Sequence, residues 1–243
     1  MKIISIAGQA ALLVLCVLAL VCELDIIQFK FKTIVVVAVI LSSALVALIG
    51  SAALLIRYCH NKNVPADLIV LMVVCICPML LTLYSLGLEG IGAPNLHNIS
   101  TDMENPPALV YAQMTRSEYE GTSIYPIEHV VQQLAAYPDI KSQSVGVSAR
   151  EAFRLSMYVS SLLGWSIVSE NIAIGQIDLR SRTRFMGFKT NIAIRITAID
   201  ASNSLIDVRS ATLNAERDFA FNARQIRAFF AGFNGELRKR QMH

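Results

Sequence analysis

The chain opens with three long runs of apolar residues, and polar and apolar residues alternate only after them. The runs cover residues 3–22, 33–56 and 68–88, and none of them contains an ionised residue. A helix needs about 20 consecutive apolar residues to cross the hydrocarbon core of a bilayer. The pattern therefore predicts three N-terminal transmembrane helices. We interpret them as an anchor, because charged residues usually mark a transport path inside a membrane.

Shorter periodic segments follow the apolar runs. PIEHVVQQLAAY predicts a short helix, and SAREAFRLSMYVSSLLG predicts a longer one, in which Ser148 and Glu151 match a capping box and Gly164 supplies the stop. Four alternating stretches, WSIVSE, IGQIDLRSRTRF, TNIAIRITAI and SLIDVRSATL, predict strands. DASNS predicts a turn between the last two strands. A final helix with an apolar stripe is expected to begin at Asn222.

These elements together predict an α+β fold. Residues 1–90 would form an anchor of three transmembrane helices, and residues 91–243 a soluble α+β domain. In this domain a four-stranded, mainly antiparallel sheet would carry helices on one face, as a two-layer structure. A domain of about 150 residues is an ordinary size for one hydrophobic core.

The period of two in the predicted strands sorts their side chains into two faces. The isoleucines of TNIAIRITAI point one way and its arginine points the other. If the polar faces coincide, the open side of the sheet is a field of arginines with two aspartates, which suits carboxylate, phosphate or sugar-acid ligands. A solvated face with cross-strand ion pairs is the alternative, and it is the more common case. In IGQIDLRSRTRF the shared face carries Asp178, Arg180, Arg182 and Arg184. The residues expected to recognise a ligand are Arg184, Arg195, Asp207 and Arg209.

Composition narrows the functional classes. Hydrophobic residues make up 54% of the chain and charged residues 16%, against about 25% charged residues in soluble domains. The net charge of +3 gives no case for a nucleic-acid partner. The five cysteines all precede residue 78, so the predicted soluble domain has no disulfide, thiolate metal site or cysteine nucleophile.

The sequence carries no familiar catalytic or cofactor motif. G-x-S-x-G, H-E-x-x-H, Walker and G-x-G-x-x-G patterns do not occur, and the histidines are too few for a triad or a three-histidine metal site. Glu118, Glu120 and Glu128 could supply paired carboxylates, but their segment is typical of an exposed loop. We therefore expect no cofactor, no metal and no catalytic residue, and an enzyme is the weaker hypothesis.

The basic residues that flank the apolar runs indicate an orientation. With the N-terminus in the cytoplasm, Lys2, Arg57 and Lys62 lie inside, and Lys30 and Lys32 lie outside. Three spans would then place the C-terminal domain outside the cytoplasm, in the periplasm of a Gram-negative bacterium. We expect a multi-pass protein of the bacterial inner membrane. Its expected partners are the lipid bilayer and either a membrane protein complex or a second copy of the chain.

Four strings in one order resemble a known family. HNISTDMENPP, AAYPDI, TRFMGF and DVRSAT…DFAFNARQI resemble the bacterial envelope family called domain of unknown function 1499. The similarity covers most of residues 94–235 and implies an envelope protein without an established biochemical activity. The first string contributes His97, Thr101, Asp102 and Asn105. Because its Pro-Pro pair forces an extended path, we interpret this string as a structural tether.

Two departures from the family pattern replace acids with neutral residues. After MGF the family tends to have x-Asp-Asp, whereas this chain has Thr190 and Asn191 in place of the two acids. After His97 an acid is frequent in the family, and Asn98 stands here. The resemblance therefore implies that any metal binding or acid–base chemistry of those acids is lost in this chain.

Three functional hypotheses follow. The first is a non-enzymatic integral inner-membrane protein whose periplasmic domain binds an envelope component or a protein partner. Replacing Arg195 and Arg209 with Gln should then remove binding and leave thermal stability nearly unchanged. The second is an accessory subunit of a membrane protein complex that packs through its transmembrane helices. The third is an envelope hydrolase, which requires the carboxylates of Asp102 and Asp207 to lie close together.

Overall fold

The computed structural model describes most of the chain after residue 88 and short stretches before it. The described residues are 41, 45, 48–53, 55–56, 58–60, 80, 84, 89–90, 92–110, 125–183, 188–213 and 218–242. The chain divides into two compact units, the first formed by Met1–Leu88 with Arg184–Gly187 and the second by Glu89–Thr183 with Phe188–His243. The predicted division into an anchor and a soluble domain stays a prediction.

The first unit has helical backbone at its described positions up to residue 84. Most of the three apolar runs lies outside the described residues. Among the residues that are described, no helix is long and apolar enough to cross a membrane. The longest described stretch in the runs, residues 48–53, is far below the roughly 20 residues that a span needs. The predicted fold class with three transmembrane helices is therefore wrong for the described part of the chain.

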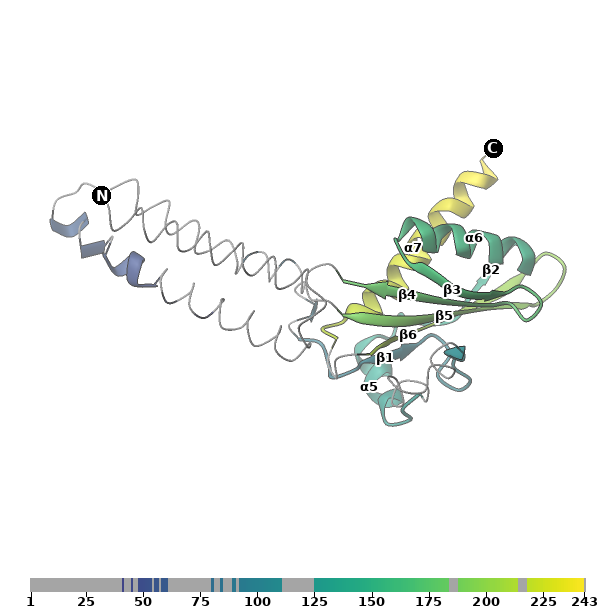
Figure 1. Cartoon of the computed structure of the whole chain (residues 1–243), viewed down its shortest axis with the longest axis horizontal. Helices are drawn as coiled ribbons and strands as arrows, with labels where there is room; N and C mark the ends of the chain where they lie inside the picture. Colours follow the sequence, from purple (N-terminus) through teal and green to yellow (C-terminus); the bar gives the residue numbers. More distant parts are fainter. Residues whose placement is uncertain are drawn as a thin grey trace. The chain divides into compact units, whose positions relative to one another are not determined.

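The second unit contains a six-stranded antiparallel sheet (Figure 1). Its strands are β1 (Asn98–Ser100), β2 (Gln143–Val145), β3 (Ser166–Asn171), β4 (Gln176–Arg182), β5 (Lys189–Ala198) and β6 (Ser204–Thr212). The order along the sheet is β1-β6-β5-β4-β3, and β2 also pairs with β6. The prediction of a four-stranded sheet is wrong, because β1 and β2, with three residues each, are too short to show a period of two.

Three helices accompany this sheet. They are α5 (His129–Ala136), α6 (Ala149–Leu162) and α7 (Phe221–Gln241). α6 and α7 pack on one face of the sheet, and α5 lies beside β1 at its edge (Figure 1). Both predicted ends of α6 are confirmed: the Ser148 hydroxyl accepts a hydrogen bond from the Glu151 backbone N–H at 3.3 Å, and Gly164 has a φ of +73°. The start of α7 is one residue earlier than predicted.

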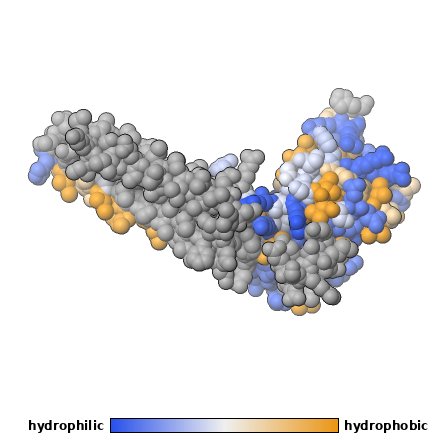
Figure 2. All heavy atoms as spheres, viewed as in Figure 1, coloured by the Kyte–Doolittle hydropathy of each residue, from blue (hydrophilic) through white to orange (hydrophobic). Residues whose placement is uncertain are grey.

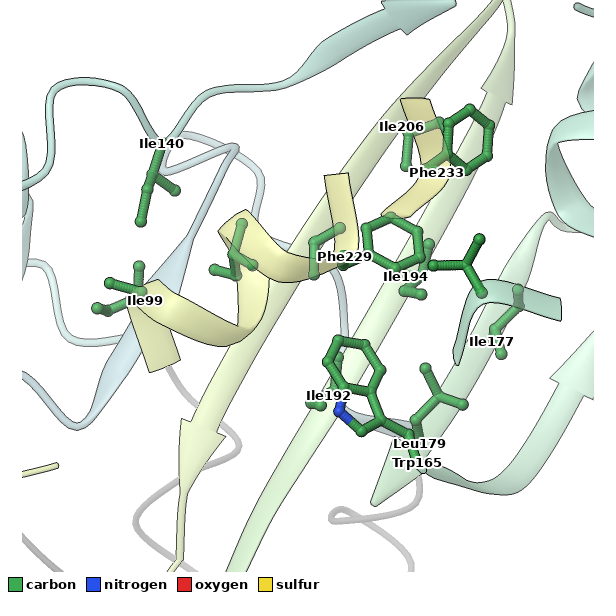
Figure 3. Close-up of a cluster of buried hydrophobic side chains, with 14 of the residues drawn as sticks. Ile99, Ile140, Trp165, Ile177, Leu179, Ile192, Ile194, Ile206, Phe229 and Phe233 are labelled. Atoms are coloured by element: carbon green, nitrogen blue, oxygen red, sulfur yellow. The ribbon is translucent and has the colours of Figure 1, made fainter. Parts of the chain in front are cut away.

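The hydrophobic core lies between the sheet and helices α6 and α7 (Figure 3). Ile192 and Ile194 of β5 lie beside Trp165 and Phe229, and the rings of Trp165 and Phe229 stack with centroids 6.1 Å apart. Burying an apolar side chain of this size stabilises a fold by about 1.5–3 kcal/mol. Because the isoleucines of β5 face this core, the residues between them must point to the second face of the sheet.

The outer surface of the second unit is mixed in character. Hydrophilic residues surround separate hydrophobic patches on its visible face (Figure 2). Exposed polar residues and scattered apolar ones are ordinary on a protein surface. The informative polar residues are therefore those that the fold buries, and several of them, Gln176, Asp178, Asn191, Asp207 and Arg209, lie on the second face of the sheet.

Candidate functional site

Strand register brings the polar residues of this second face together. Arg195 of β5 lies directly opposite Asp207 of β6 and Gln176 of β4. Arg180 of β4 lies opposite Asn191 of β5. Residues in such positions have Cβ atoms about 4.5–5.5 Å apart. The polar side chains of β4, β5 and β6 therefore form one continuous surface.

Residues 101–110, which we call the strap, cross this surface and have no regular secondary structure up to residue 109. Gln176 Nε2 donates to the Ala108 carbonyl oxygen at 2.9 Å, and the Val110 N–H donates to Asp178 Oδ1 at 3.3 Å. Burial raises the pKa of the Asp178 carboxyl. The end of the strap is thus bound to β4.

An apolar contact holds the same end of the strap. Leu109 is buried in a cluster with Ala193 of β5 and Ala211 of β6. Small residues at these two sheet positions leave room for the leucine side chain. The predicted open face of arginines is therefore wrong, because the strap covers part of it.

Arg195 holds the first part of the strap. Its Nη2 donates to Asp102 Oδ2 at 2.7 Å and to Asp207 Oδ2 at 2.8 Å, and its Nη1 donates to the Asn105 carbonyl oxygen at 2.9 Å. The side chains of Arg195 and Asp102 are 21% and 25% exposed, and that of Asp207 is 1% exposed. A carboxylate buried to this degree needs a paired charge. The guanidinium supplies that charge and ties the strap to it.

The second oxygen of Asp207 is also occupied. Asp207 Oδ1 accepts from Ser142 Oγ at 2.5 Å and from Thr101 Oγ1 at 3.4 Å. Asp102 and Asp207 do lie close together, as the hydrolase hypothesis requires. Both of them, however, bind the Arg195 guanidinium, which makes them its counter-ions. Their arrangement gives them a structural role, and the hydrolase hypothesis stays a prediction.

Arg209 is buried and holds the strap from β6. Its Nε donates to Asn98 Oδ1 at 3.0 Å, and its Nη1 donates to the Pro107 carbonyl oxygen at 3.3 Å. The guanidinium lies 5.6 Å from the centroid of the Tyr125 ring. Burial lowers the pKa of Arg209 to about 10, so the group is still cationic at neutral pH. Its contacts join β1, β6 and the strap.

The motif HNISTDMENPP forms β1 and the first half of the strap. The His97 carbonyl oxygen accepts from Asn222 Nδ2 at 2.9 Å, and the His97 and His129 rings meet edge to face with centroids 5.2 Å apart. β1 runs antiparallel to β6. The motif therefore lies along the sheet and is anchored to α7, and its role as a tether stays a prediction.

Asn191 is a buried residue of this face. Its side-chain amide makes no hydrogen bond within the described part of the chain. The residue is 4% exposed, and neither Nδ2 nor Oδ1 has a partner within the described part of the chain. On the opposite face of β5 the hydroxyl of Thr190, a residue 1% exposed, is in the same condition. A buried polar group without a partner costs about 1–3 kcal/mol, so such a group calls for a physical explanation.

Basic residues lie around the Asn191 amide. Arg180 is directly opposite on β4, and two register positions further along, on the same face, Arg182 is opposite Lys189. We call Arg180, Arg182, Lys189 and Asn191 the Asn191 site.

The motif, the strap and the helix that anchors them lie in a segment that matches a known protein family. A family model described as protein of unknown function (DUF1499) matches residues 98–233. The chain belongs to the DUF1499 family. The match runs from β1 into α7 and so includes the strap, the Arg195 cluster and the Asn191 site. None of the curated proteins matches the chain.

Three of the four predicted recognition residues lie on the polar face of the DUF1499 domain. Arg195, Asp207 and Arg209 are there, with their polar atoms engaged in the contacts to the strap and to one another. Arg184 lies outside the described residues. Within the described residues, no three side chains of His, Cys, Asp or Glu come together as a metal site.

Asn191 was missed as a site residue by the sequence analysis. The signal that could have found it is its place in the DUF1499 pattern, where the resemblance expects an acid. Sequence alone could not show that the neutral side chain is buried, because its burial depends on strand pairing and on cover from other parts of the chain.

Proposed function

We propose that the second unit is a non-catalytic binding domain that takes an anionic group of its ligand at the Asn191 site. The observation that supports this is the Asn191 side-chain amide, which is buried without a hydrogen bond in the described part of the chain and lies opposite Arg180. A ligand group at this position would remove the free-energy cost of the unbonded amide.

An anion fits the site better than a neutral or cationic group. Guanidinium groups bind carboxylates and phosphates through charge-assisted hydrogen bonds. Arg195 and Arg209, the arginines that sequence favoured, already bind the strap. Recognition is therefore assigned to a different part of the same face.

The proposal keeps the binding activity of the first sequence hypothesis and changes its residues. An envelope component as the ligand and a location in the bacterial envelope stay predictions. The role of accessory subunit in a protein complex also stays a prediction.

Sulfate and acetate titrations of the full-length chain test the proposal. At about ten times its dissociation constant, a bound anion raises the free energy of unfolding by about 1.4 kcal/mol, which is about 3 °C in melting temperature. The Asn191→Leu variant should lose this anion-dependent shift. It should also be more stable than the wild type without anion, because a buried group without partners has been removed.

Thr190→Val is the matched control. It removes the neighbouring unbonded hydroxyl from the other face of β5 and should be stabilising while it keeps the full anion-dependent shift. Sulfate also stabilises proteins non-specifically, so the comparison between the two variants decides the result. Equal shifts in wild type, Asn191→Leu and Thr190→Val would refute the proposal.

A further inference from the structure

The Asn191 amide has two different hydrogen-bonding needs. A side-chain amide carries two N–H donors and a carbonyl oxygen that accepts. Both Nδ2 and Oδ1 of Asn191 are buried without a partner in the described part of the chain. A flip of the amide exchanges the positions of Nδ2 and Oδ1, but Nδ2 still needs an acceptor and Oδ1 still needs a donor. The bound group must therefore accept one hydrogen bond and donate another.

A bare anion meets only half of this requirement. Carboxylate, sulfate and fully ionised phosphate oxygens accept hydrogen bonds and cannot donate. They can bind the amide N–H and the guanidinium of Arg180, which lies opposite Asn191. The Asn191 carbonyl oxygen would stay buried without a donor, at a cost of about 1–3 kcal/mol.

From this pairing of needs, and resting on the proposed function, we infer that the ligand is a hydroxylated anion. It carries a carboxylate or phosphate group with a hydroxyl on the adjacent carbon or the next. The anionic oxygens accept from the Asn191 amide and from Arg180, and the hydroxyl donates to the Asn191 carbonyl oxygen. Because the two amide heteroatoms share one carbon, the hydroxyl and the anionic group of the ligand must lie close together.

The neighbourhood of the amide favours a short carbon skeleton. Ala211 lies opposite Asn191 on β6 and belongs to the apolar cluster with Leu109 and Ala193. Leu109 already packs over the two alanines, so the room beside the amide suits only a short carbon skeleton. Hydroxy acids and polyol phosphates combine an anionic group and a hydroxyl on such a short carbon skeleton.

Two matched pairs of probes test the inference on the full-length chain. Lactate and propionate share a three-carbon skeleton and differ by one hydroxyl, and glycerol 3-phosphate and propyl phosphate differ in the same way by two. Isothermal titration calorimetry at pH 8 keeps both phosphate esters ionised, since the second pKa of a phosphate ester is about 6. Each probe is titrated into wild type, Asn191→Leu and Thr190→Val.

We expect the hydroxylated member of at least one pair to bind the wild type about tenfold more tightly, which corresponds to about 1.4 kcal/mol. Asn191→Leu should lose this preference, and Thr190→Val should keep it. The pair that shows the preference identifies the anionic group as carboxylate or phosphate.

Two results would overturn the inference in distinguishable ways. If both members of each pair bind equally and their binding still depends on Asn191, the requirement for a hydroxyl is refuted and the anion-binding proposal stays intact. The absence of any binding that depends on Asn191 refutes both.

Discussion

Replacement of Arg195 with Gln is expected to destabilise the protein strongly. The wild-type guanidinium is the charged partner of Asp207, whose side chain is 1% exposed, and it also holds Asp102 and the Asn105 carbonyl oxygen of the strap. In the variant a buried carboxylate keeps its hydroxyl donors but loses its counter-ion. The strap loses its hydrogen bonds to β5 at the same time.

The magnitude follows from the burial of the pair. Removing one partner of a buried ion pair costs about 3–5 kcal/mol. Arg195 itself is 21% exposed, and water can partly solvate the abandoned carboxylate, so we expect a loss near the lower limit, about 3 kcal/mol. For a chain of this size the melting temperature should fall by about 6–12 °C.

Urea unfolding followed by tryptophan fluorescence measures this loss. The chain has a single tryptophan, Trp165, and its ring is buried against Phe229. Arg227→Gln is the matched control, because Arg227 pairs with Glu89 and Asp139, whose side chains are 43% and 52% exposed. Each such exposed pair contributes at most about 1 kcal/mol.

A double variant separates charge from packing. Arg195→Gln with Asp207→Asn removes both buried charges, so it should recover part of the stability lost in Arg195→Gln alone. If Arg195→Gln unfolds within about 0.5 kcal/mol of the wild type, at the level of an ordinary surface substitution, the reasoning is refuted. Arg195 would then be a surface recognition residue, as the sequence hypothesis expected.

Three further changes test other parts of the structure. Leu109→Ala should lower the free energy of unfolding in urea by about 2–5 kcal/mol, since Leu109 fills the space over Ala193 and Ala211; a change below 1 kcal/mol would mean that the strap does not pack there. Burial raises the pKa of Asp218 from 3.8 to about 6, so the folded state binds this proton more tightly and loses stability as the pH rises from about 4 to 6. Compared with Asp218→Asn, the wild type should lose about 2–3 kcal/mol more across this range in urea titrations, and parallel pH profiles would contradict the assignment. Gly175→Ala should lower the melting temperature by several degrees, because Gly175 has a φ of +68° and an added Cβ would lie 2.0 Å from the Ile196 carbonyl oxygen; an unchanged melting temperature would argue against this turn.

Local features of the fold could be predicted from sequence because their causes lie within a few residues. The cap at Ser148 and the stop at Gly164 are set by neighbours in the chain. The turn before β6 is similar: Asp200 Oδ1 accepts from the backbone N–H groups of Ser202 and Asn203. Hairpin register then follows, and it placed Arg195 on the polar face of the sheet.

The strap that covers part of that polar face could not be predicted in the same way. A strand that is polar on one side shows the same period of two whether water or another segment lies over it. The bond between Arg195 and Asp102 joins residues 93 positions apart, and nothing local encodes it. The short strands β1 and β2 depend in the same way on pairing with β6.

The proposed site lies at residues other than the predicted ones for a related reason. Sequence favours arginines as recognition residues because their charge is visible, and it cannot show which of them the fold uses internally. Arg195 and Arg209 bind the strap. Asn191 stands out in the sequence only as a neutral residue where the family pattern has an acid, and its role becomes visible only when its burial and its missing hydrogen bonds are known.

The most direct test of the central claim observes the Asn191 side chain itself. In a ¹H–¹⁵N correlation spectrum of the full-length protein, the Asn191 amide pair is identified as the signals that disappear in Asn191→Leu. Titration with lactate or with glycerol 3-phosphate should shift these two signals to a saturable end point, together with the backbone amide of Arg180 opposite them. If both remain in place while either ligand is raised to tens of millimolar, roughly a hundred times a submillimolar dissociation constant, the Asn191 site does not bind a hydroxylated anion.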